Sequence, residues 1–228
     1  MTTKEKLLAL LEDSKGTFFS GEEIARTLQV SRAAVWKAVS ALREDGYTID
    51  AATNKGYRLS PDSDILSPQG IRRFLKPEYR DLDLTVLPTA PSTNALVREK
   101  ANQGCPEGCV IVACEQTDGR GRYGRQFFSP VDSGVYLSLL LRPTAYSPQQ
   151  ATCLTAAAAA AMCQAIEAVT GQQPGIKWVN DIFLHGKKVC GILTEAAVGL
   201  ETGTLNYMVL GAGVNLYPPV KGFPEEIQ

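Results

Sequence analysis

The chain has 228 residues, which is long enough for one large domain or two smaller ones with a packed core. With 44% hydrophobic and 21% charged residues and a net charge of −1, its composition is that of an ordinary globular protein and argues against a general affinity for polyanions. We find no apolar run of about 18 residues, so we expect no membrane-spanning helix, and the charged N-terminus lacks the apolar block of a signal peptide.

The cysteine and histidine content narrows the chemistry further. Because His185 is the only histidine, a histidine base or a multi-histidine metal site is nearly excluded. No C-x-x-C pair and no other metal-ligand spacing is present, so we expect no metal held by protein ligands. The six cysteines lie mostly in apolar surroundings and are interpreted as reduced core residues of a cytoplasmic protein: Cys105, Cys109, Cys114, Cys153, Cys163 and Cys190.

Residues 1–60 have the pattern of a winged helix-turn-helix domain. Leucines at helical spacing predict a first helix that ends near "SKG", and "SGEEIARTLQV" opens a second helix with a capping box at Ser20. A third helix is predicted from the cap Ser31 to Gly46, only a few residues after the second. "YTID" and "GYRLS" then form two short strands around the turn "AATNKG", which is the wing.

The functional interpretation of this domain is DNA binding through the third helix and the wing. An alternative is that the winged helix serves as a protein-interaction module, since the segment carries little net charge. Trp36 is expected to be a core or helix-packing residue. The residues predicted to contact DNA are Arg32, Lys37, Ser40 and Arg43 on the helix and Lys55 and Arg58 on the wing.

Residues 61–66 form a polar linker that contains Pro61, and residues 67–228 are predicted to form a second, mixed-sheet α/β domain. The overall fold class is therefore α+β. The chain ends at "FPEEIQ", which resembles the first turn of a helix, so we expect it to be truncated. The predicted elements are helices at 67–76, 92–104 and 147–169 and strands at 82–88, 108–116 and 133–143, followed by a strand–turn–strand unit at 175–198 and a last strand at 204–216.

Four segments of the second domain concentrate polar and charged groups at strand ends, where α/β proteins build binding sites. They are "PSTN" (91–94), "EQTDGRGRYGR" (115–125), "KWVND" (177–181), in which Trp178 is expected to be buried, and "GKKVCGI" (186–192). Cations outnumber acids among them, so the ligand is expected to be anionic. "GRGRYG" satisfies the G-x-G-x-x-G pattern, but a strand rather than a helix follows it, which excludes a dinucleotide fingerprint, and no Walker P-loop occurs.

In this order, and behind a winged helix, "GRGRYGR", "KWVND", "KKVCGIL-E" and "GAGVN" resemble the motifs of the biotin–protein ligase family, and in particular of its bifunctional members, which are also biotin operon repressors. The resemblance covers essentially the whole chain. It implies a small C-terminal β-domain, which we expect the truncated chain to lack. By motif matching it implies that Lys177, Arg122 and Asp181 are catalytic, and that biotin or its adenylate is bound by Ser92, Thr93, Asn94, Gln116, Gly119, Arg120, Gly121, Arg122, Lys188, Gly191, Gly211, Gly213 and Asn215.

The sequence departs from the family pattern at three positions. Val179 stands in place of the usual proline, and Phe127 in place of a frequent tryptophan, where it keeps an aromatic face for the adenine. Asp118 puts an acid beside a site for anions and is expected to weaken ligand affinity modestly. None of the three removes a cation that the chemistry requires.

The resemblance implies the substrates and partners as well. The substrates would be biotin and ATP, with Mg²⁺ accompanying the ATP, and the acceptor would be a lysine of a biotin carboxyl carrier protein. Operator DNA and a ligand-promoted homodimer are further implied, with no membrane partner. Two alternatives remain: a biotin-sensing repressor without catalysis, and a lipoate–protein ligase, whose loop carries a histidine that is absent from this loop.

Overall fold

A computed structural model of the chain describes residues 1–143, 150–199, 204–219 and 222–223. The chain divides into two compact units, Met1–Asp81 and Leu82–Gln228. Residues 67–81, which were expected to begin the second domain, group with the first unit. The predicted helix start at 147–149 and the predicted helical turn at 224–228 lie outside the described residues.

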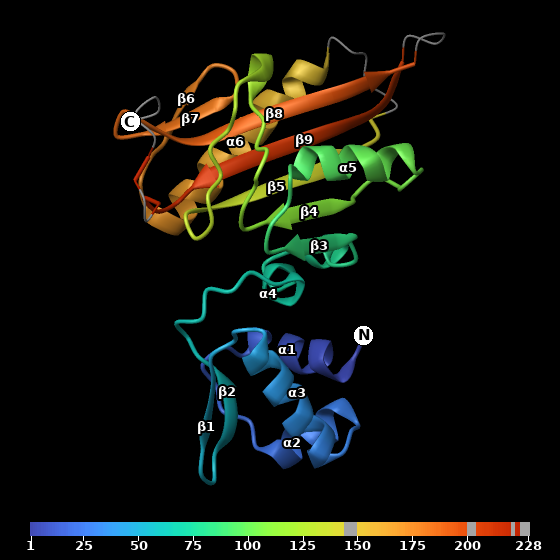
Figure 1. Cartoon of the computed structure of the whole chain (residues 1–228), viewed down its shortest axis with the longest axis vertical. Helices are drawn as coiled ribbons and strands as arrows, with labels where there is room; N and C mark the ends of the chain where they lie inside the picture. The colour runs from blue at the N-terminus through green and yellow to red at the C-terminus, as the bar shows by residue number, and fades with distance from the viewer. Residues whose placement is uncertain (144–149, 200–203, 220–221, 224–228) are drawn as a thin grey trace. The chain divides into compact units, whose positions relative to one another are not determined.

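The first unit has the predicted winged helix-turn-helix architecture (Figure 1). Its helices begin at the expected caps, because Ser20 Oγ accepts a hydrogen bond from Glu23 N (3.0 Å) and Ser31 Oγ accepts one from Ala34 N (3.2 Å). A core of apolar side chains from all three helices and the wing holds the unit together. The elements are α1 (Thr3–Asp13), α2 (Gly21–Leu28), α3 (Arg32–Glu44), β1 (Ile49–Ala52) and β2 (Gly56–Leu59).

A short helix, α4 (Pro68–Arg72), and a 3₁₀ turn, η1 (Pro77–Tyr79), complete the first unit. Helix α4 packs against α1, and the buried Glu12 carboxylate lies 3.6 Å from the Arg73 guanidinium. This contact between α1 and the segment after α4 explains why residues 67–81 group with the winged helix.

The second unit is built on a seven-stranded mixed sheet of strand order β3-β4-β5-β9-β8-β7-β6. Strands β3 and β4 are parallel, and every other pair is antiparallel. The segment that was expected to give two strands gives three, because residues 178–180 separate β6 from β7. The strands are β3 (Leu84–Leu87), β4 (Val110–Ala113), β5 (Gly134–Leu141), β6 (Gly175–Lys177), β7 (Asp181–Leu184), β8 (Lys187–Val198) and β9 (Leu205–Asn215).

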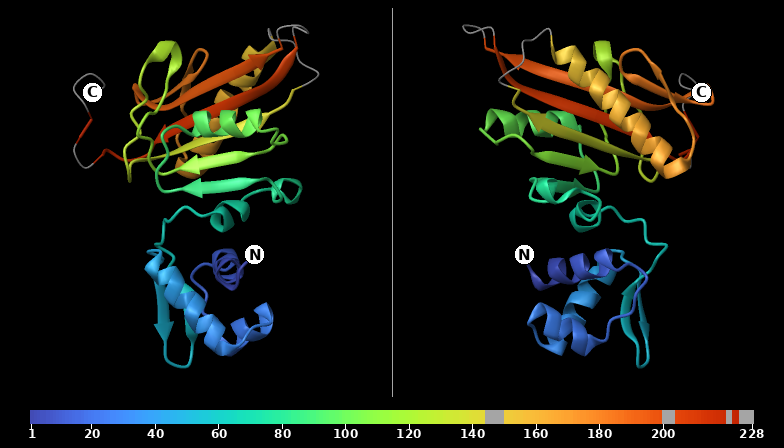
Figure 2. Two further views of the ribbon diagram at one scale, coloured as in Figure 1. Left: turned by 45° about the vertical axis from the view of Figure 1, so that its right-hand side comes forward. Right: turned by 180° about the vertical axis from the view of Figure 1, so that it is seen from behind.

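Two helices cover opposite faces of this sheet (Figure 2). Helix α5 (Thr93–Asn102) contacts β4, β5 and β9, and α6 (Ala151–Thr170) contacts β6, β7 and β8. Successive side chains of strand β8 point to opposite faces of the sheet, so the strand contributes to the layers on both sides. Its residues Cys190 and Ile192 belong to the core beneath α6, whereas Leu193 and Glu195 contact the Asn94 side chain of α5 through hydrogen bonds.

The sequence predicted no membrane-spanning helix, but within the described part of the chain α6 is long and apolar enough to pass a test of length and composition. Residues Cys153–Thr170 form 18 helical residues with a mean hydropathy of 1.4, which suffices by length and composition alone. Six consecutive alanines lie in this segment, and their small side chains let the helix approach the sheet closely, with Ala159 fully buried. One such helix, packed along a sheet, is weak support for a membrane span.

The cysteines are free thiols, but they are not all core residues. Burial raises the pKa of the Cys109 and Cys190 thiols to about 12, so both are protonated and unreactive at neutral pH. Cys153 is exposed on α6, which corrects the expectation for that residue.

Candidate active site

A cavity lies at the N-terminal end of α5, over the middle of β8 and β9. The four polar segments singled out in the sequence meet there, each contributing lining residues. Most of the predicted ligand-binding residues line it, namely Ser92, Thr93, Asn94, Gln116, Arg120, Gly121, Arg122, Lys188, Gly191, Gly211 and Gly213, together with the predicted catalytic residue Asp181.

A chain of hydrogen bonds fixes the polar wall of the cavity. Thr93 N and Oγ1 both donate to Gln116 Oε1, at 2.8 and 3.1 Å, and Gln116 Nε2 donates to Ser129 Oγ at 3.1 Å. Ser138 Oγ lies 2.8 Å from Thr93 Oγ1, and it is fully buried. Buried polar groups held by such partners are preorganised for a ligand, because they do not have to reorient when it binds.

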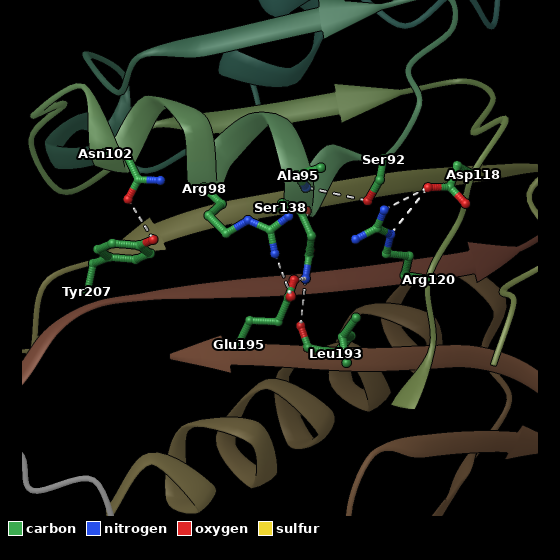
Figure 3. A network of polar contacts seen from close by, with 11 residues as sticks. Ser92, Ala95, Arg98, Asn102, Asp118, Arg120, Ser138, Leu193, Glu195 and Tyr207 are labelled. Carbon is green, nitrogen blue, oxygen red and sulfur yellow. Dashed lines mark hydrogen bonds and ion pairs between the residues drawn. The ribbon is translucent and has the colours of Figure 1, made fainter. Parts of the chain in front are cut away.

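Asn94 is the centre of a second set of contacts, and Figure 3 labels its partners Ser138, Leu193 and Glu195. Its Oδ1 atom accepts from Ser138 Oγ at 2.6 Å, and its Nδ2 atom donates to Glu195 Oε2 at 2.7 Å and to Leu193 O at 3.3 Å. Arg98 in turn donates to Glu195 Oε1 at 3.1 Å. These bonds tie the first turn of α5 to β5 and β8, and so fix the end of the helix that lines the cavity.

Glycines make room for this packing at the floor of the cavity. A Cβ atom at Gly211 would lie 2.0 Å from Asn94 Oδ1, and one at Gly213 would lie 2.4 Å from the Phe127 ring. A Cβ atom at Gly191 would also meet Phe127, at 2.8 Å. The ring of Phe127 therefore lies directly on the backbone of β8 and β9, where it forms the aromatic part of the lining.

Three cations line the cavity, and two of them have an acidic partner. Arg120 pairs with Asp118 at 2.9 Å, and hydrogen bonding to Asp118 raises the pKa of its guanidinium. Lys188 Nζ lies 2.8 Å from Asp181 Oδ1. Within the described part of the chain no carboxylate pairs with Arg122, whose Nη1 donates instead to Asn180 Oδ1 at 2.9 Å.

Three predicted site residues do not line this cavity. Lys177, on the exposed strand β6, places its ammonium 5.5 Å from the centroid of the Phe183 ring, and Asn215 accepts a hydrogen bond from Tyr136 at 3.2 Å. Gly119 belongs to the arginine loop at 118–125, and a Cβ atom there would meet Phe127 O at 2.3 Å. The expectation that Trp178 is buried was wrong, because its side chain is 76% exposed.

Several residues of the site were not assigned from the sequence. Asn180 lines the cavity and joins Arg122 to Asp181, because its Nδ2 atom donates to Asp181 Oδ1 at 2.9 Å. A second cavity adjoins the first, with Arg122, Asn180 and Ile192 lining both. Glu195 is the last residue of the quoted motif "KKVCGIL-E", but no role was predicted for it. Ser138 is a lone hydroxyl residue in the apolar run "YLSLLL", and that pattern could have indicated a buried polar contact.

The cluster that could hold a metal ion by geometry lies elsewhere. The ligand atoms of Asp83, Cys105 and Cys109 lie within 4.8 Å of one another, and none of these residues lines either cavity. Thiols suit soft metal ions rather than Mg²⁺, which prefers oxygen ligands.

On the winged helix, the structure divides the predicted DNA contacts into two groups. The guanidinium of Arg43 donates to Ile49 O at 3.0 and 2.6 Å, and Arg58 pairs with Asp50 at 2.8 Å, so both are held against the protein. Arg32 and Lys37 are exposed on α3, and Ser40 is partly exposed there. Lys55 extends from the wing, with its ammonium 5.9 Å from the centroid of the Phe18 ring.

Comparison with known proteins identifies the family. Residues 86–215 match the Biotin/lipoate A/B protein ligase family, and residues 3–58 match an HTH domain. Over 227 residues the chain is 40% identical to the bifunctional ligase/repressor BirA of Bacillus subtilis (strain 168). The match covers 100% of this chain and 69% of that protein. The chain belongs to the biotin/lipoate A/B protein ligase family.

Further relatives support the biotin branch of this family. The bifunctional ligase/repressor BirA of Escherichia coli (strain K12) is 33% identical over 215 residues, covering 94% of this chain and 64% of that protein. A solved structure of the biotin protein ligase from Aquifex aeolicus in complex with biotin and ATP is 29% identical, with a TM-score of 0.50, and covers 64% of this chain and 56% of that chain. The chain therefore carries a biotin protein ligase domain behind an HTH DNA-binding domain, which confirms the resemblance inferred from its motifs and the α+β fold class.

Proposed function

We propose that this member of the biotin/lipoate A/B protein ligase family joins biotin to ATP and then transfers it to a lysine of a biotin carboxyl carrier protein. The observation that carries the proposal is the pairing, in one cavity, of a preorganised polar wall with three cations. The neutral ring system of biotin suits the wall, and the cations suit its carboxylate and a nucleotide phosphate.

In the first step a biotin carboxylate oxygen attacks the α-phosphorus of ATP. A new oxygen–phosphorus bond forms, the bond to the bridging oxygen of the β-phosphate breaks, and pyrophosphate leaves. At an effective dielectric constant of about 20, two unit charges about 4 Å apart repel by about 4 kcal/mol, so fixed cations decide whether the two anions can approach. Arg120, Arg122 and Lys188 supply that charge, and the protein needs no nucleophile of its own.

Mg²⁺ fits this site only as a companion of ATP. Among the described residues that line the cavity, Asp181 carries the one carboxylate, and it is already paired with Lys188. The nucleotide phosphates and water would therefore supply most of the oxygen ligands, as is usual for Mg²⁺, which would neutralise phosphate charge when bound.

In the second step a neutral lysine amine of the acceptor attacks the acyl carbon of biotinoyl-5′-AMP. The bond from that carbon to the phosphate oxygen breaks, AMP leaves, and the amine loses a proton. We assign Asp181 the role of orienting or deprotonating the amine; Lys188 and Asn180 both contact its Oδ1 atom, and the carboxylate lines the cavity. We assign to Lys177 the stabilisation of charge at phosphorus. For this role its ammonium group has to move away from the Phe183 ring and towards the cavity.

The reaction sequence can be tested in one assay. We expect pyrophosphate when the chain is incubated with biotin, ATP and Mg²⁺, and labelled acceptor when a biotin carboxyl carrier domain is added. Pyrophosphate without labelled acceptor would restrict the activity to adenylation. Biotin binding without pyrophosphate would leave a biotin sensor, and labelling with lipoate in place of biotin would favour a lipoate ligase.

The arginine loop is expected to become more ordered when ligand binds. Biotinoyl-5′-AMP hydrolyses readily, so the loop at 118–125 has to exclude water while the acceptor is awaited. Hydrogen exchange measured with and without biotin should show stronger protection of this loop in the bound state. Equal protection in both states would contradict the closure.

The winged helix gives the second half of the proposal, a biotin-responsive repressor. Biotin-bound chains would dimerise and place two α3 helices on an operator with two half-sites, as symmetric readers do. We propose a cytoplasmic location, because operator DNA and a carboxylase subunit are the partners that this function requires.

A further inference from the structure

Trp36 is the feature of the winged helix that the proposed function leaves unexplained. The sequence predicted a core or helix-packing residue at this position, but its side chain is 61% exposed. The core face of α3 is made by Val35, Ala38, Val39 and Leu42, all buried, and Trp36 lies off that stripe. An exposed indole offers a partner both an apolar ring and an N–H donor, and its position on α3 decides what that partner can be.

The surroundings of Trp36 indicate what kind of partner it has. At helical spacing, Trp36 shares its face of α3 with Arg32 one turn before it and Ser40 one turn after it, beside Ala33 and Lys37. Within the described part of the chain, no ion pair engages Arg32 or Lys37. This face therefore carries uncompensated positive charge around one aromatic ring, with a small alanine beside it that allows close approach.

These charges favour a DNA duplex over an apolar protein surface, because exposed cations pair with phosphates and an apolar partner would have to bury them unpaired. In helix-turn-helix proteins the first turns of the recognition helix contact base edges in the major groove. Trp36 is the fifth residue of α3 and lies in that part of the helix. The one apolar group that base edges present in the major groove is the C5-methyl group of thymine.

We propose that Trp36 is a sequence-reading residue whose indole packs against a thymine C5-methyl group in each operator half-site, with Arg32 and Lys37 on the flanking phosphates or bases. The inference rests on the DNA-binding half of the proposed function. It adds the chemical class of the base that the domain selects.

Its test starts from duplexes enriched out of a random 40-base-pair library by the whole chain with biotin, ATP and Mg²⁺. The enriched duplex is also made with deoxyuridine in place of thymidine, which removes the methyl groups and keeps the base pairing. For the unsubstituted chain this change should weaken binding about four-fold per half-site, the factor that corresponds to burial of one methyl group. Trp36→Ala should weaken binding to the thymidine duplex about ten-fold per half-site and should bind both duplexes equally.

Phe74→Ala is the matched control, because Phe74 is an exposed aromatic residue of the same unit that lies outside α3 and the wing. It should bind both duplexes as the unsubstituted chain does. In a Trp178→Phe background Trp36 is the only tryptophan, so its fluorescence should change when the thymidine duplex is added. Unchanged biotin affinity and an unchanged melting temperature of Trp36→Ala show that the variant is folded.

Three outcomes would overturn the inference, and they are distinguishable. If Trp36→Ala bound the thymidine duplex as tightly as the unsubstituted chain, Trp36 would not contact DNA. If it bound more weakly but still discriminated against deoxyuridine, the indole would contact the backbone rather than thymine. If the unsubstituted chain enriched no duplex, the DNA-binding function itself would fail, and with it this role of Trp36.

Discussion

Replacing Gly211 with alanine should weaken biotin binding at least about a hundred-fold while the winged helix remains intact. The added Cβ atom would lie 2.0 Å from Asn94 Oδ1, so the Asn94 side chain would have to move. That movement is costly because Ser138, Glu195 and Leu193 all hold this amide by hydrogen bonds. A buried polar group that loses its partner costs about 1–3 kcal/mol, and more than one bond would be lost here.

The consequence for the ligand follows from the place of Gly211 in the sheet. It pairs with Ser138 on one side and with Leu193 on the other, so it lies beneath the link between α5 and β8. A shift of Asn94 would displace the first turn of α5, where the residues that line the cavity are 2–5% exposed and have little room to adjust. Isothermal titration with biotin measures the effect, and thermal unfolding checks that the second unit is still folded.

Two further variants make the prediction specific. Gly175→Ala is the matched control, because Gly175 belongs to the same sheet, has ordinary backbone angles and has open space where a Cβ atom would be. Its biotin affinity should not change. If the clash is with the Asn94 side chain, then adding Asn94→Ala to Gly211→Ala should lose less affinity than the sum of the two single changes. Strict additivity would contradict the mechanism.

The winged helix could be predicted almost completely from the sequence, because the signals that define it are local. Leu7, Leu11 and Leu42 have helical spacing, and each is fully buried. Ser20 and Ser31 are caps that act within their own first turn. Exposure of Trp36 was missed because it was expected to be a core or helix-packing residue, although its position next to Val35 rotates it by about 100° from the apolar stripe.

The ligand cavity was predictable as a set of residues but not as a set of contacts. Motif matching named Asn94 and Gly211 as separate residues. Only the folded sheet shows that the Asn94 side chain lies against the backbone of Gly211, which leaves no space for a Cβ atom there. Glu195 and Ser138 lie far from Asn94 in the sequence, so their partnership depends on the order of strands in the sheet. Lys177 illustrates the limit of a motif, which gives a residue but not the direction of its side chain.

Replacing Arg122 with alanine should slow adenylation about a hundred- to a thousand-fold and should shorten the lifetime of bound biotinoyl-5′-AMP by a similar factor. The charge balance of the cavity gives the reason. Asp118 compensates Arg120, and Asp181 compensates Lys188, so the net positive charge of these groups comes from Arg122. Without Arg122 the carboxylate and the α-phosphate would have to approach in a site whose own charges cancel.

The loop also depends on Arg122 for its position. Its Nη1 atom donates to Asn180 Oδ1, which joins the arginine loop to the segment between β6 and β7. Loss of that bond would release the loop from the mouth of the cavity, so water would reach the mixed anhydride. Pyrophosphate release in a single turnover reports the first effect, and retention of radiolabelled adenylate on a filter reports the second.

Arg125 supplies the matched control, because it lies on the same loop but does not line the cavity. Arg125→Ala removes one positive charge from the chain, as Arg122→Ala does, so a general electrostatic effect would appear equally in both variants. If the effect is specific, only Arg122→Ala loses the adenylate rapidly, and Arg122→Lys recovers part of the retention by restoring charge without the guanidinium fork that bonds Asn180. Equal retention by Arg122→Ala and the unsubstituted chain would assign closure of the site to other groups and leave Arg122 without a role in it.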